Sequence, residues 1–249
     1  MSEWPQKFLH AFKEGNHYDS ISAAQEDLTL DDAYDIQCRY VSLRGEPISG
    51  YKAAMTANQA QQAMGIDKPI IGALFAAGAH PQGKPVALTR PILLETELAF
   101  RVNQPVNTPV TADSAFQCVD ACLPMIELAA PNLATQPNAL DLVATNSASH
   151  GYIAGTEADM GAIDFDTLSV RLLADNAEQW CGTGASVLGG QREALAFLIN
   201  EVLARGYSVE AGHLMMTGSI GGILPGRAGQ FIGDFGPLGE IRFALQEAQ

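Results

Sequence analysis

The chain changes character at Gly50, and this change narrows the folds that it can adopt. Before Gly50, apolar residues such as Phe8 and Phe12 recur at helical spacing, and Thr29 with the acidic residues after it is typical of a helix start. After Gly50, short apolar runs alternate with glycine and proline, which is typical of strands joined by turns. We predict an α+β fold with a helical N-terminal region, residues 1–49, and a β-rich body, residues 50–249, in one compact unit.

Within these regions the apolar spacing predicts individual elements. Residues 5–45 are expected to be helical, ending at Gly45, and residues 191–205 carry an apolar stripe at helical spacing, with Gly206 suited to the position after the helix. Short apolar runs predict strands at 70–71, 86–88, 92–100, 125–130, 160–163, 168–173, 213–217, 230–235 and 240–245.

The charge balance limits the possible partners. The chain has 28 acidic and 14 basic side chains, a formal net charge of −14, which repels nucleic acid and anionic membrane surfaces. No apolar run is long enough to cross a membrane, and the N-terminus lacks the apolar stretch of a signal peptide, so we expect a cytoplasmic protein. A small anionic substrate would need local positive charge, from a bound metal or from a rare lysine or arginine.

The four cysteines give no evidence of a zinc site or a disulfide framework. Cys38, Cys118, Cys122 and Cys181 contain no CxxC pair, although Cys118 and Cys122 could share a helix face. We therefore expect four reduced and mostly buried thiols.

The segment around Glu95 and Glu97 is the most informative for chemistry. In a strand, residues two apart point to the same face, so these two carboxylates point together while Leu94 and Leu98 face the other way. Two like charges side by side on an apolar strand repel each other and lose hydration. A divalent cation offsets both costs, and hard cations such as Mg²⁺ or Mn²⁺ prefer oxygen ligands. The alternative is a solvated face on an edge strand.

Glu127 is the only charged residue in an apolar run at 122–131, and a carboxylate in such a run needs a partner. Together with Glu95 and Glu97 it makes a three-carboxylate site that leaves metal positions for water and substrate. Pairing of Glu127 with a lone arginine is the alternative.

Other segments offer groups for binding or proton transfer. Lys52 lies among small and apolar residues, where its pKa is easily changed, or it is an ordinary surface lysine. Residues 144–151 form a polar stretch in which His150 is a candidate base, or a turn that satisfies its own backbone. Residues 217–222 form a glycine-rich turn whose N–H groups can bind a carboxylate, although no phosphate-loop motif is present.

The ordered set of motifs resembles the fumarylacetoacetate hydrolase superfamily, and within it the branch of 2-oxopent-4-enoate hydratases and 4-oxalocrotonate decarboxylases. The likeness extends over nearly the whole chain. It rests on residues 32–37, 50–56, 64–69, 72–75, 95–100, 124–127, 184–189 and 211–219. It implies a mixed β-roll or sandwich body behind a helical N-terminal part.

The resemblance also implies site residues and a cofactor. Glu95, Glu97 and Glu127 match the ligands of a bound Mg²⁺ or Mn²⁺, and Lys52 matches the lysine of the family's G-x-K segment. Asn146 and Ser149 fall where the branch has Asn and Ser, and we assign them a catalytic role with Lys52. Backbone and side chain of the turn at Gly218, Ser219 and Gly221 are assigned to substrate binding.

The implied activity is a lyase reaction on a small anionic 2-oxo acid, with water added to a dienoate such as 2-hydroxypenta-2,4-dienoate. Decarboxylation of a 2-oxo diacid, hydrolysis of an acylpyruvate and non-catalytic binding of a 2-oxo acid are the alternatives. The resemblance further implies a homo-oligomer or a complex with a related decarboxylase or hydratase. Two departures stand out: Ile70 replaces an acidic residue of the branch, and Thr145 replaces a second one.

Overall fold

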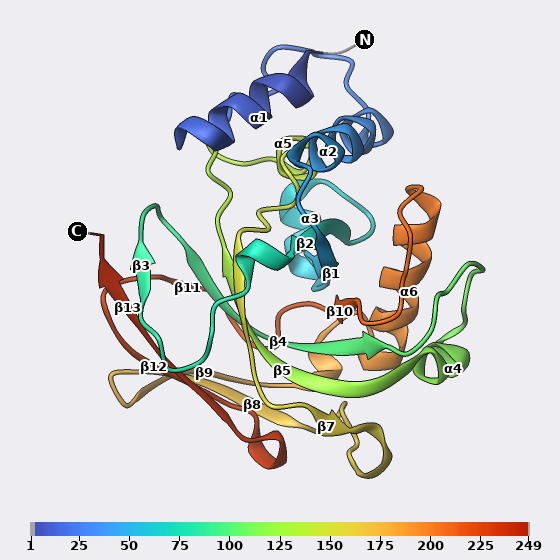
Figure 1. The fold of residues 1–249 in the computed structure, drawn as a ribbon, viewed down its shortest axis with the longest axis vertical. Helices are drawn as coiled ribbons and strands as arrows, with labels where there is room; N and C mark the ends of the chain where they lie inside the picture. Colours follow the sequence, from blue (N-terminus) through green and yellow to red (C-terminus); the bar gives the residue numbers. More distant parts are fainter. Residues whose placement is uncertain (1–2, 249) are drawn as a thin grey trace.

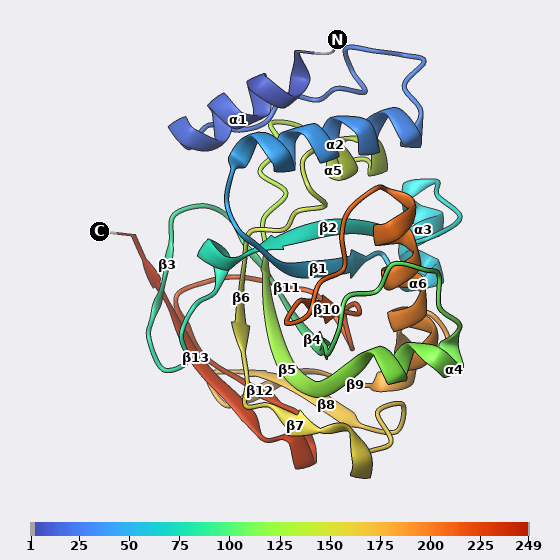
Figure 2. The ribbon, with the colours of Figure 1, turned by 45° about the vertical axis from the view of Figure 1, so that its right-hand side comes forward.

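The computed structural model describes residues 3–248, and the chain is arranged in three layers. Figures 1 and 2 show helices of the N-terminal part at the top, a curled sheet in the middle and a second sheet below it. The top layer consists of α1 (Trp4–Glu14), α2 (Leu30–Arg44) and α5 (Ala139–Ala144), with α2 packed against the other two. The predicted α+β class is confirmed.

Helix α2 begins and ends where the sequence indicates. The Thr29 side chain accepts a hydrogen bond from the Asp32 backbone N–H, and the Asp32 carboxylate accepts one from the Thr29 backbone. Gly45 then ends the helix in the left-handed region, at φ 63°. The expectation of helix throughout residues 5–45 is wrong at 15–29, because Gly15 ends α1 and Ser20 and Ser22 bind the carboxylate of Asp141.

The middle sheet is built around two long antiparallel strands. Its hydrogen-bonded order is β2 (Ile70–Phe75), β1 (Ile48–Ala54), β10 (Leu214–Met216), β4 (Leu93–Val102), β5 (Val119–Ala129) and β6 (Gly151–Ala154), with β11 (Leu224–Pro225) beside β4 and β7 (Ala158–Asp159) beside β5. The segment after β2 returns to the other end of this order, because Ala79 bridges to Tyr152 and the His80 N–H donates to the Tyr152 carbonyl, 2.8 Å away. The sheet therefore curls back on itself, and it has an inner and an outer face (Figure 1).

The outer face of the curled sheet packs on the second sheet. That sheet has the order β3 (Val86–Leu88), β13 (Glu240–Glu247), β12 (Gly229–Asp234), β8 (Ser169–Ala174) and β9 (Ala177–Thr183). Leu94, Leu98 and Ile126 belong to the same buried cluster as Phe231 and Phe243 of the second sheet. The inner face has a separate buried cluster, made of Leu74, Ala99, Ala121, Leu123, Met125, Tyr152 and Met216.

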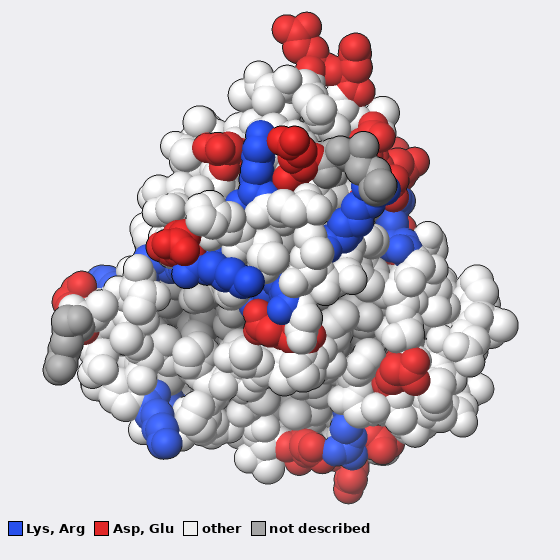
Figure 3. Space-filling model, turned by 45° about the horizontal axis from the view of Figure 1, so that its top comes forward, with Lys and Arg blue, Asp and Glu red and all other residues white. Residues whose placement is uncertain are grey.

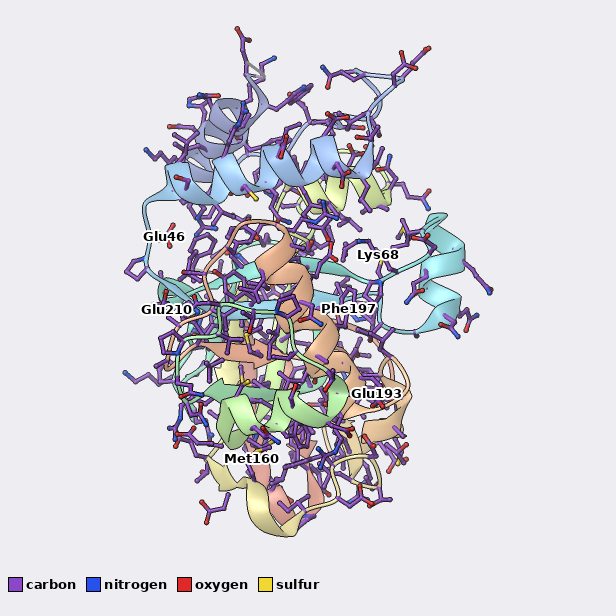
Figure 4. The ribbon with its side chains drawn as sticks, turned by 90° about the vertical axis from the view of Figure 1, so that its right-hand side faces the viewer. Glu46, Lys68, Met160, Glu193, Phe197 and Glu210 are labelled. Carbon is purple, nitrogen blue, oxygen red and sulfur yellow. The ribbon has the colours of Figure 1, made fainter. Side chains whose placement is uncertain are left out.

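The remaining helices flank the curled sheet. They are α3 (Asn58–Met64), the short α4 (Ala112–Ala115) and α6 (Gln191–Ala204), whose buried residues include the predicted stripe of Ala194, Leu195, Leu198 and Val202. Figure 4 looks onto α6, with Glu193 and Phe197 on its near side. Arg205 follows the helix, and Gly206 then adopts the left-handed φ of 79°.

Several strand predictions are confirmed with small shifts, but one is wrong. Residues 160–163 do not form a strand, because the chain makes a 3₁₀ turn at Met160–Ala162 between β7 and β8. A four-residue run with Gly161 at its centre has too little side-chain surface to pack as a strand. Strands β1, β6 and β9 were not predicted.

The cysteines and the helices bear on two further expectations. All four thiols are free, but Cys122 alone is buried, since Cys38 and Cys118 are half-buried and Cys181 is exposed. Within residues 3–248, no helix has both the length and the apolar character needed to cross a membrane.

Candidate metal centre

The register of β4 and β5 brings the three predicted carboxylates together. Glu95 lies directly opposite Glu127, and strand alternation places Glu97 on the same inner face. One carboxylate oxygen from each of the three residues lies within 4.8 Å of the other two. Glu97 is 1% exposed and Glu127 is fully buried, so only Glu95 keeps partial contact with solvent.

Lys52 supplies the positive charge inside this cluster. It lies on β1, and its ammonium nitrogen is 2.8 Å from Oε1 of Glu127, with the lysine only 2% exposed. The same nitrogen donates to the Ser147 carbonyl at 3.2 Å. Burial alone would lower the pKa of Lys52, but Glu127, followed by Glu95 and Glu97, outweighs that effect and raises it. Lys52 is therefore held as a buried ammonium.

One lysine does not balance three carboxylates. Burial, and then the charge of Glu127, raises the pKa of Glu95 to about 7, and burial with both neighbouring carboxylates raises the pKa of Glu97 well above its usual range. Apart from the ion pair with Lys52, neither Glu127 oxygen has a hydrogen-bond partner in the described part of the chain. Buried carboxylate oxygens without partners are costly, and a divalent cation among three such groups removes that cost. The donor set therefore fits a hard divalent metal ion.

The glycine-rich turn predicted to bind a carboxylate binds one from its own chain. The Gly218 N–H donates to Oε2 of Glu97 at 2.9 Å, and the Ser219 side chain is a hydrogen-bond partner of Glu95. Gly218 has a φ of +122°, and a Cβ there would lie 2.5 Å from the side chain of Thr56, so this close approach requires glycine. The turn thus holds two of the three carboxylates in place.

Gly221, the third residue assigned to this turn, contacts an aromatic ring. A Cβ at Gly221 would lie 2.2 Å from Cδ1 of Trp180, so the indole packs directly on the turn. The indole Nε1 donates to the Thr96 hydroxyl at 3.3 Å, and that hydroxyl donates to the Ile220 carbonyl at 2.7 Å. Neither Trp180 nor Thr96 was singled out from the sequence. The position of Thr96 between the two glutamates was the one available indication.

Asn146 and Ser149 lie at the open edge of β2. The Asn146 side chain accepts from the Ala73 N–H at 2.7 Å and donates to the Ala73 carbonyl at 2.9 Å, and the Ser149 hydroxyl donates to the same carbonyl at 2.8 Å. The Ser147 hydroxyl similarly donates to the Ile71 carbonyl. This loop therefore completes the edge of β2 with side chains and holds the Ser147 carbonyl against Lys52.

The two departures from the branch are also resolved in the fold. Ile70 pairs with Ala54 and is fully buried, on the same side of β1 and β2 as Lys52 and Gly72. Thr145 is buried and donates its hydroxyl to the Asp141 carbonyl at 2.8 Å. An apolar side chain thus lies on the Lys52 face of these strands, at the position where the resemblance predicts an acid.

Comparison with known proteins identifies relatives over nearly the full length. No family model matches the sequence. The 2-oxo-hept-4-ene-1,7-dioate hydratase of Escherichia coli is 26% identical, over 95% of this chain and 94% of the relative. The 4-oxalocrotonate decarboxylase of Pseudomonas sp. (strain CF600) is 29% identical over 80% and 78%, and the 2-keto-4-pentenoate hydratase of Paraburkholderia xenovorans (strain LB400) is 26% identical over 99% and 95%.

Solved structures show the same fold. The 4-oxalocrotonate decarboxylase from Pseudomonas putida G7, complexed with magnesium and adipate, superposes with a TM-score of 0.91 at 24% identity, over 98% of this chain and 96% of that one. Fumarylpyruvate hydrolase from Pseudomonas aeruginosa, in complex with Mn²⁺ and pyruvate, gives 0.63 at 14% identity, over 82% and 91%. The chain belongs to the fumarylacetoacetate hydrolase superfamily, within the lyase branch that contains the 2-oxo-dienoate hydratases and the 4-oxalocrotonate decarboxylases.

Proposed function

We propose that this protein is a metal-dependent hydratase that adds water to a short 2-hydroxy-dienoate such as 2-hydroxypenta-2,4-dienoate. The observation that carries the proposal is the convergence of Glu95, Glu97 and Glu127 around a buried Lys52. The relatives support it, since hydratases of 2-oxo-alkenoates match the chain almost from end to end. Related structures hold magnesium or Mn²⁺, so we propose one of these ions as the cofactor.

The charges of the site suit an anionic substrate. Three carboxylates and one ammonium sum to −2, which a divalent cation neutralises. When bound between Glu95, Glu97 and Glu127, the cation supplies Lewis acidity toward the carboxylate and the 2-oxygen of the substrate. Glu97, Glu127 and Lys52 are buried away from bulk water, which strengthens the electrostatic contacts among them.

We assign proton transfer to Lys52. Its ammonium is buried, fixed by Glu127 and the Ser147 carbonyl, and close to the proposed metal ligands. It holds a proton at Nζ that it can donate to the substrate, and it recovers a proton from the added water. We assign Asn146 and Ser149 to the same machinery through the loop that they anchor, which orients the Ser147 carbonyl toward Lys52. The Gly218 N–H fixes Glu97 and the Ser219 side chain fixes Glu95. We assign this turn, with Gly221, to the border of the substrate position.

A second candidate is decarboxylation of a 2-oxo diacid. It is favoured by the TM-score of 0.91 with a 4-oxalocrotonate decarboxylase and by 29% identity with another. The two activities require the same polarised 2-oxo acid and differ in what leaves or adds afterwards, so the site residues are shared.

The test is turnover of 2-hydroxypenta-2,4-dienoate and of 4-oxalocrotonate, followed by ultraviolet absorbance with Mg²⁺, with Mn²⁺ and with a chelator. We expect the dienoate to be consumed only with metal, and Lys52→Met to lower kcat about 100-fold or more while Mn²⁺ still binds. Lys84→Met, an exposed lysine, is the matched control and should keep full activity.

Other outcomes of this assay separate the alternatives. Preferential loss of 4-oxalocrotonate would identify a decarboxylase instead. Metal-dependent binding of oxalate without turnover of either compound would identify a non-catalytic binding protein. Activity that persists in Glu97→Gln with a chelator present would refute the metal centre itself.

A further inference from the structure

A second polar cavity lies on the opposite side of β5 from the carboxylates. It has a volume of about 350 Å³, and its walls include Phe12, Val86, Ile92 and Leu128 together with Arg44 and His150. Leu128 follows Glu127 along the strand, so their side chains leave opposite faces of the sheet. Figure 3 shows a hollow in this face of the molecule, with both basic and acidic side chains around it. We propose that this cavity binds a small organic monocarboxylate with an apolar carbon body, at a site separate from the metal centre.

Arg44 forms a rigid part of the cavity. Its guanidinium lies 3.9 Å from the ring centre of Phe12 and 3.7 Å from that of Phe75, which is a cation–π contact on two rings. Its Nε and Nη2 lie 2.8 and 2.7 Å from Oε1 of Glu46. The charge of Arg44 is therefore matched by Glu46, and its position is fixed.

Arg90 supplies an unmatched charge beside the cavity, because it stands two residues before Ile92 of the lining and its charge acts on His150 of the lining. Its Nε is buried without a hydrogen-bond partner, and Arg90 forms no ion pair with any residue in 3–248. Buried donors normally find an acceptor, and a guanidinium N–H without one is costly. The missing acceptor is the group that we assign to the ligand.

The two imidazoles of the cavity lie in a positive electrostatic field. His80 and His150 both line it, and burial, followed by the charges of Arg90, His80 and Arg44, lowers the pKa of His150 to about 4. The charged groups that act on His150 are all basic. A carboxylate placed here meets the Arg44 guanidinium and two neutral imidazoles, with Glu46 as the one acid in the lining. The charge of Arg90, which acts on His150, adds to this field from beside the cavity.

The apolar walls define the rest of the ligand. A guanidinium binds a carboxylate with two parallel hydrogen bonds, while Phe12, Val86, Ile92 and Leu128 offer surface for a carbon body. The volume lies at the lower end of the range for small-molecule sites and suits a molecule of the size of benzoate. A planar aromatic or unsaturated monocarboxylate fits better than a bare inorganic anion, which would leave the apolar walls without contacts.

The experiment is a calorimetric titration of benzoate into metal-free full-length protein. Benzoate lacks a 2-oxo group, so it does not report on chelation at the carboxylates. We expect saturable binding that weakens at least about 10-fold in Arg90→Gln and is unchanged in Arg242→Gln, an exposed arginine that controls for net charge. Ala87→Phe, which narrows the cavity from β3 and keeps every charge, should also weaken binding at least about 10-fold.

Four results would overturn the proposal. One is the absence of saturable binding in the wild-type protein. Another is equal affinity for inorganic phosphate, which would mean that the apolar walls contribute nothing. The third is loss of benzoate binding in Glu97→Gln but not in Arg90→Gln, which would place the ligand at the carboxylates. If Arg90→Gln instead changes the sedimentation coefficient and leaves benzoate affinity intact, Arg90 belongs to a subunit contact and the proposal is wrong.

Discussion

Glu127 and Leu128 are neighbours in one strand, yet their side chains face groups of opposite charge. We call the cluster of Glu95, Glu97, Glu127 and Lys52 the acidic pocket, and the cavity lined by Arg44, His80 and His150 the basic pocket. On the inner face three carboxylates surround one ammonium. On the outer side Arg44 and two imidazoles share a cavity with one carboxylate, and the charge of Arg90 acts on it from beside the lining. Each pocket carries an excess of like charge that burial makes costly, so each is completed by a ligand of the opposite sign. One strand can separate two such fields because its backbone and the apolar cores on either side leave little water between them.

The two pockets also differ in how they are built. The acidic pocket rests on β1, β10, β4 and β5, which are neighbours in the sheet, and the register of β4 and β5 fixes the distance between the carboxylates. The basic pocket gathers α2, the turn after β2, the link from β3 to β4 and the loop before β6. A pocket built on paired strands holds a metal ion with small tolerance, whereas one built on loops can adjust to a larger organic ligand.

Removal of one carboxylate from the acidic pocket tests whether this pocket alone binds the metal. Glu127→Gln should weaken Mn²⁺ binding at least about 100-fold, because loss of a direct ligand costs more than loss of a residue that supports one. Equilibrium dialysis against Mn²⁺ measures this. Glu46→Gln, which removes the carboxylate of the basic pocket, is the control and should leave Mn²⁺ affinity unchanged. A similar loss in both variants would show that Mn²⁺ affinity depends on net charge and not on the three carboxylates.

Opposite pH dependences should distinguish the two pockets in the metal-free protein. The pKa of His150 is lowered to about 4, so between about pH 6.5 and 4 the unfolded chain takes up a proton that the folded chain does not. Stability should therefore fall as pH falls through this window, by roughly 3 kcal/mol at its acid end. His150→Gln should remove this acid-side loss, as urea unfolding at a series of pH values would show.

Glu95 should act with the reverse sign in the same experiment. Its pKa is raised to about 7, so the folded chain keeps a proton that the unfolded chain releases above about pH 4.5. Stability should fall as pH rises from about 4.5 to 7, and Glu95→Gln should flatten that side of the profile. Two variants that flatten the same side would contradict the assignment of opposite fields to the two pockets.

The acidic pocket could be predicted from the sequence and the basic one could not, for a physical reason. Alternation along a strand is a local rule, so Glu95 and Glu97 were placed on one face before any contact was known. The charges that act on His150 belong to Arg90, His80 and Arg44, which lie 60 or more residues away from it in the chain, so spacing gives no rule for their meeting. The same limit explains Asn146 and Ser149, whose contacts with Ala73 depend on the open edge of β2 rather than on the loop itself.

Trp180 variants should have a smaller effect, and they test what keeps the carboxylates of the acidic pocket in position. Trp180 packs on Gly221 and bonds Thr96, and so supports the turn whose Gly218 N–H binds Glu97. Trp180→Ala should weaken Mn²⁺ binding about 10-fold, in line with other residues that orient metal ligands, whereas Trp180→Phe should keep most of the affinity by packing alone. Benzoate binding in the basic pocket should be unchanged in both variants.

A third variant, Trp4→Phe, leaves Trp180 as the only indole of the chain. Quenching of Trp180 fluorescence by Mn²⁺ would then report metal binding directly.

The smallest change in stability is expected in the loop at residues 146–150, which contributes groups to both pockets. Asn146, Ser147 and Ala148 have φ values of 69°, 51° and 60°, a left-handed run that is unfavourable for residues with a Cβ. At one end of the loop the Ser147 carbonyl accepts a hydrogen bond from Lys52, and the other end leads to His150 in the basic pocket. Ala148 also accepts a hydrogen bond from the Ala130 N–H, which holds its backbone in this conformation.

Ala148→Gly should relieve part of this strain and raise the free energy of unfolding by about 0.5 kcal/mol, because glycine adopts positive φ readily but loses more entropy on folding. That gain corresponds to an increase in Tm of about 1–2 °C for a chain of this length, measurable by calorimetry. If the loop only supports the fold, Mn²⁺ and benzoate affinities should stay as in the wild type. If instead either affinity falls while Tm rises, the left-handed run is required to present Ser147 and His150 to their pockets, and the two sites share one strained segment.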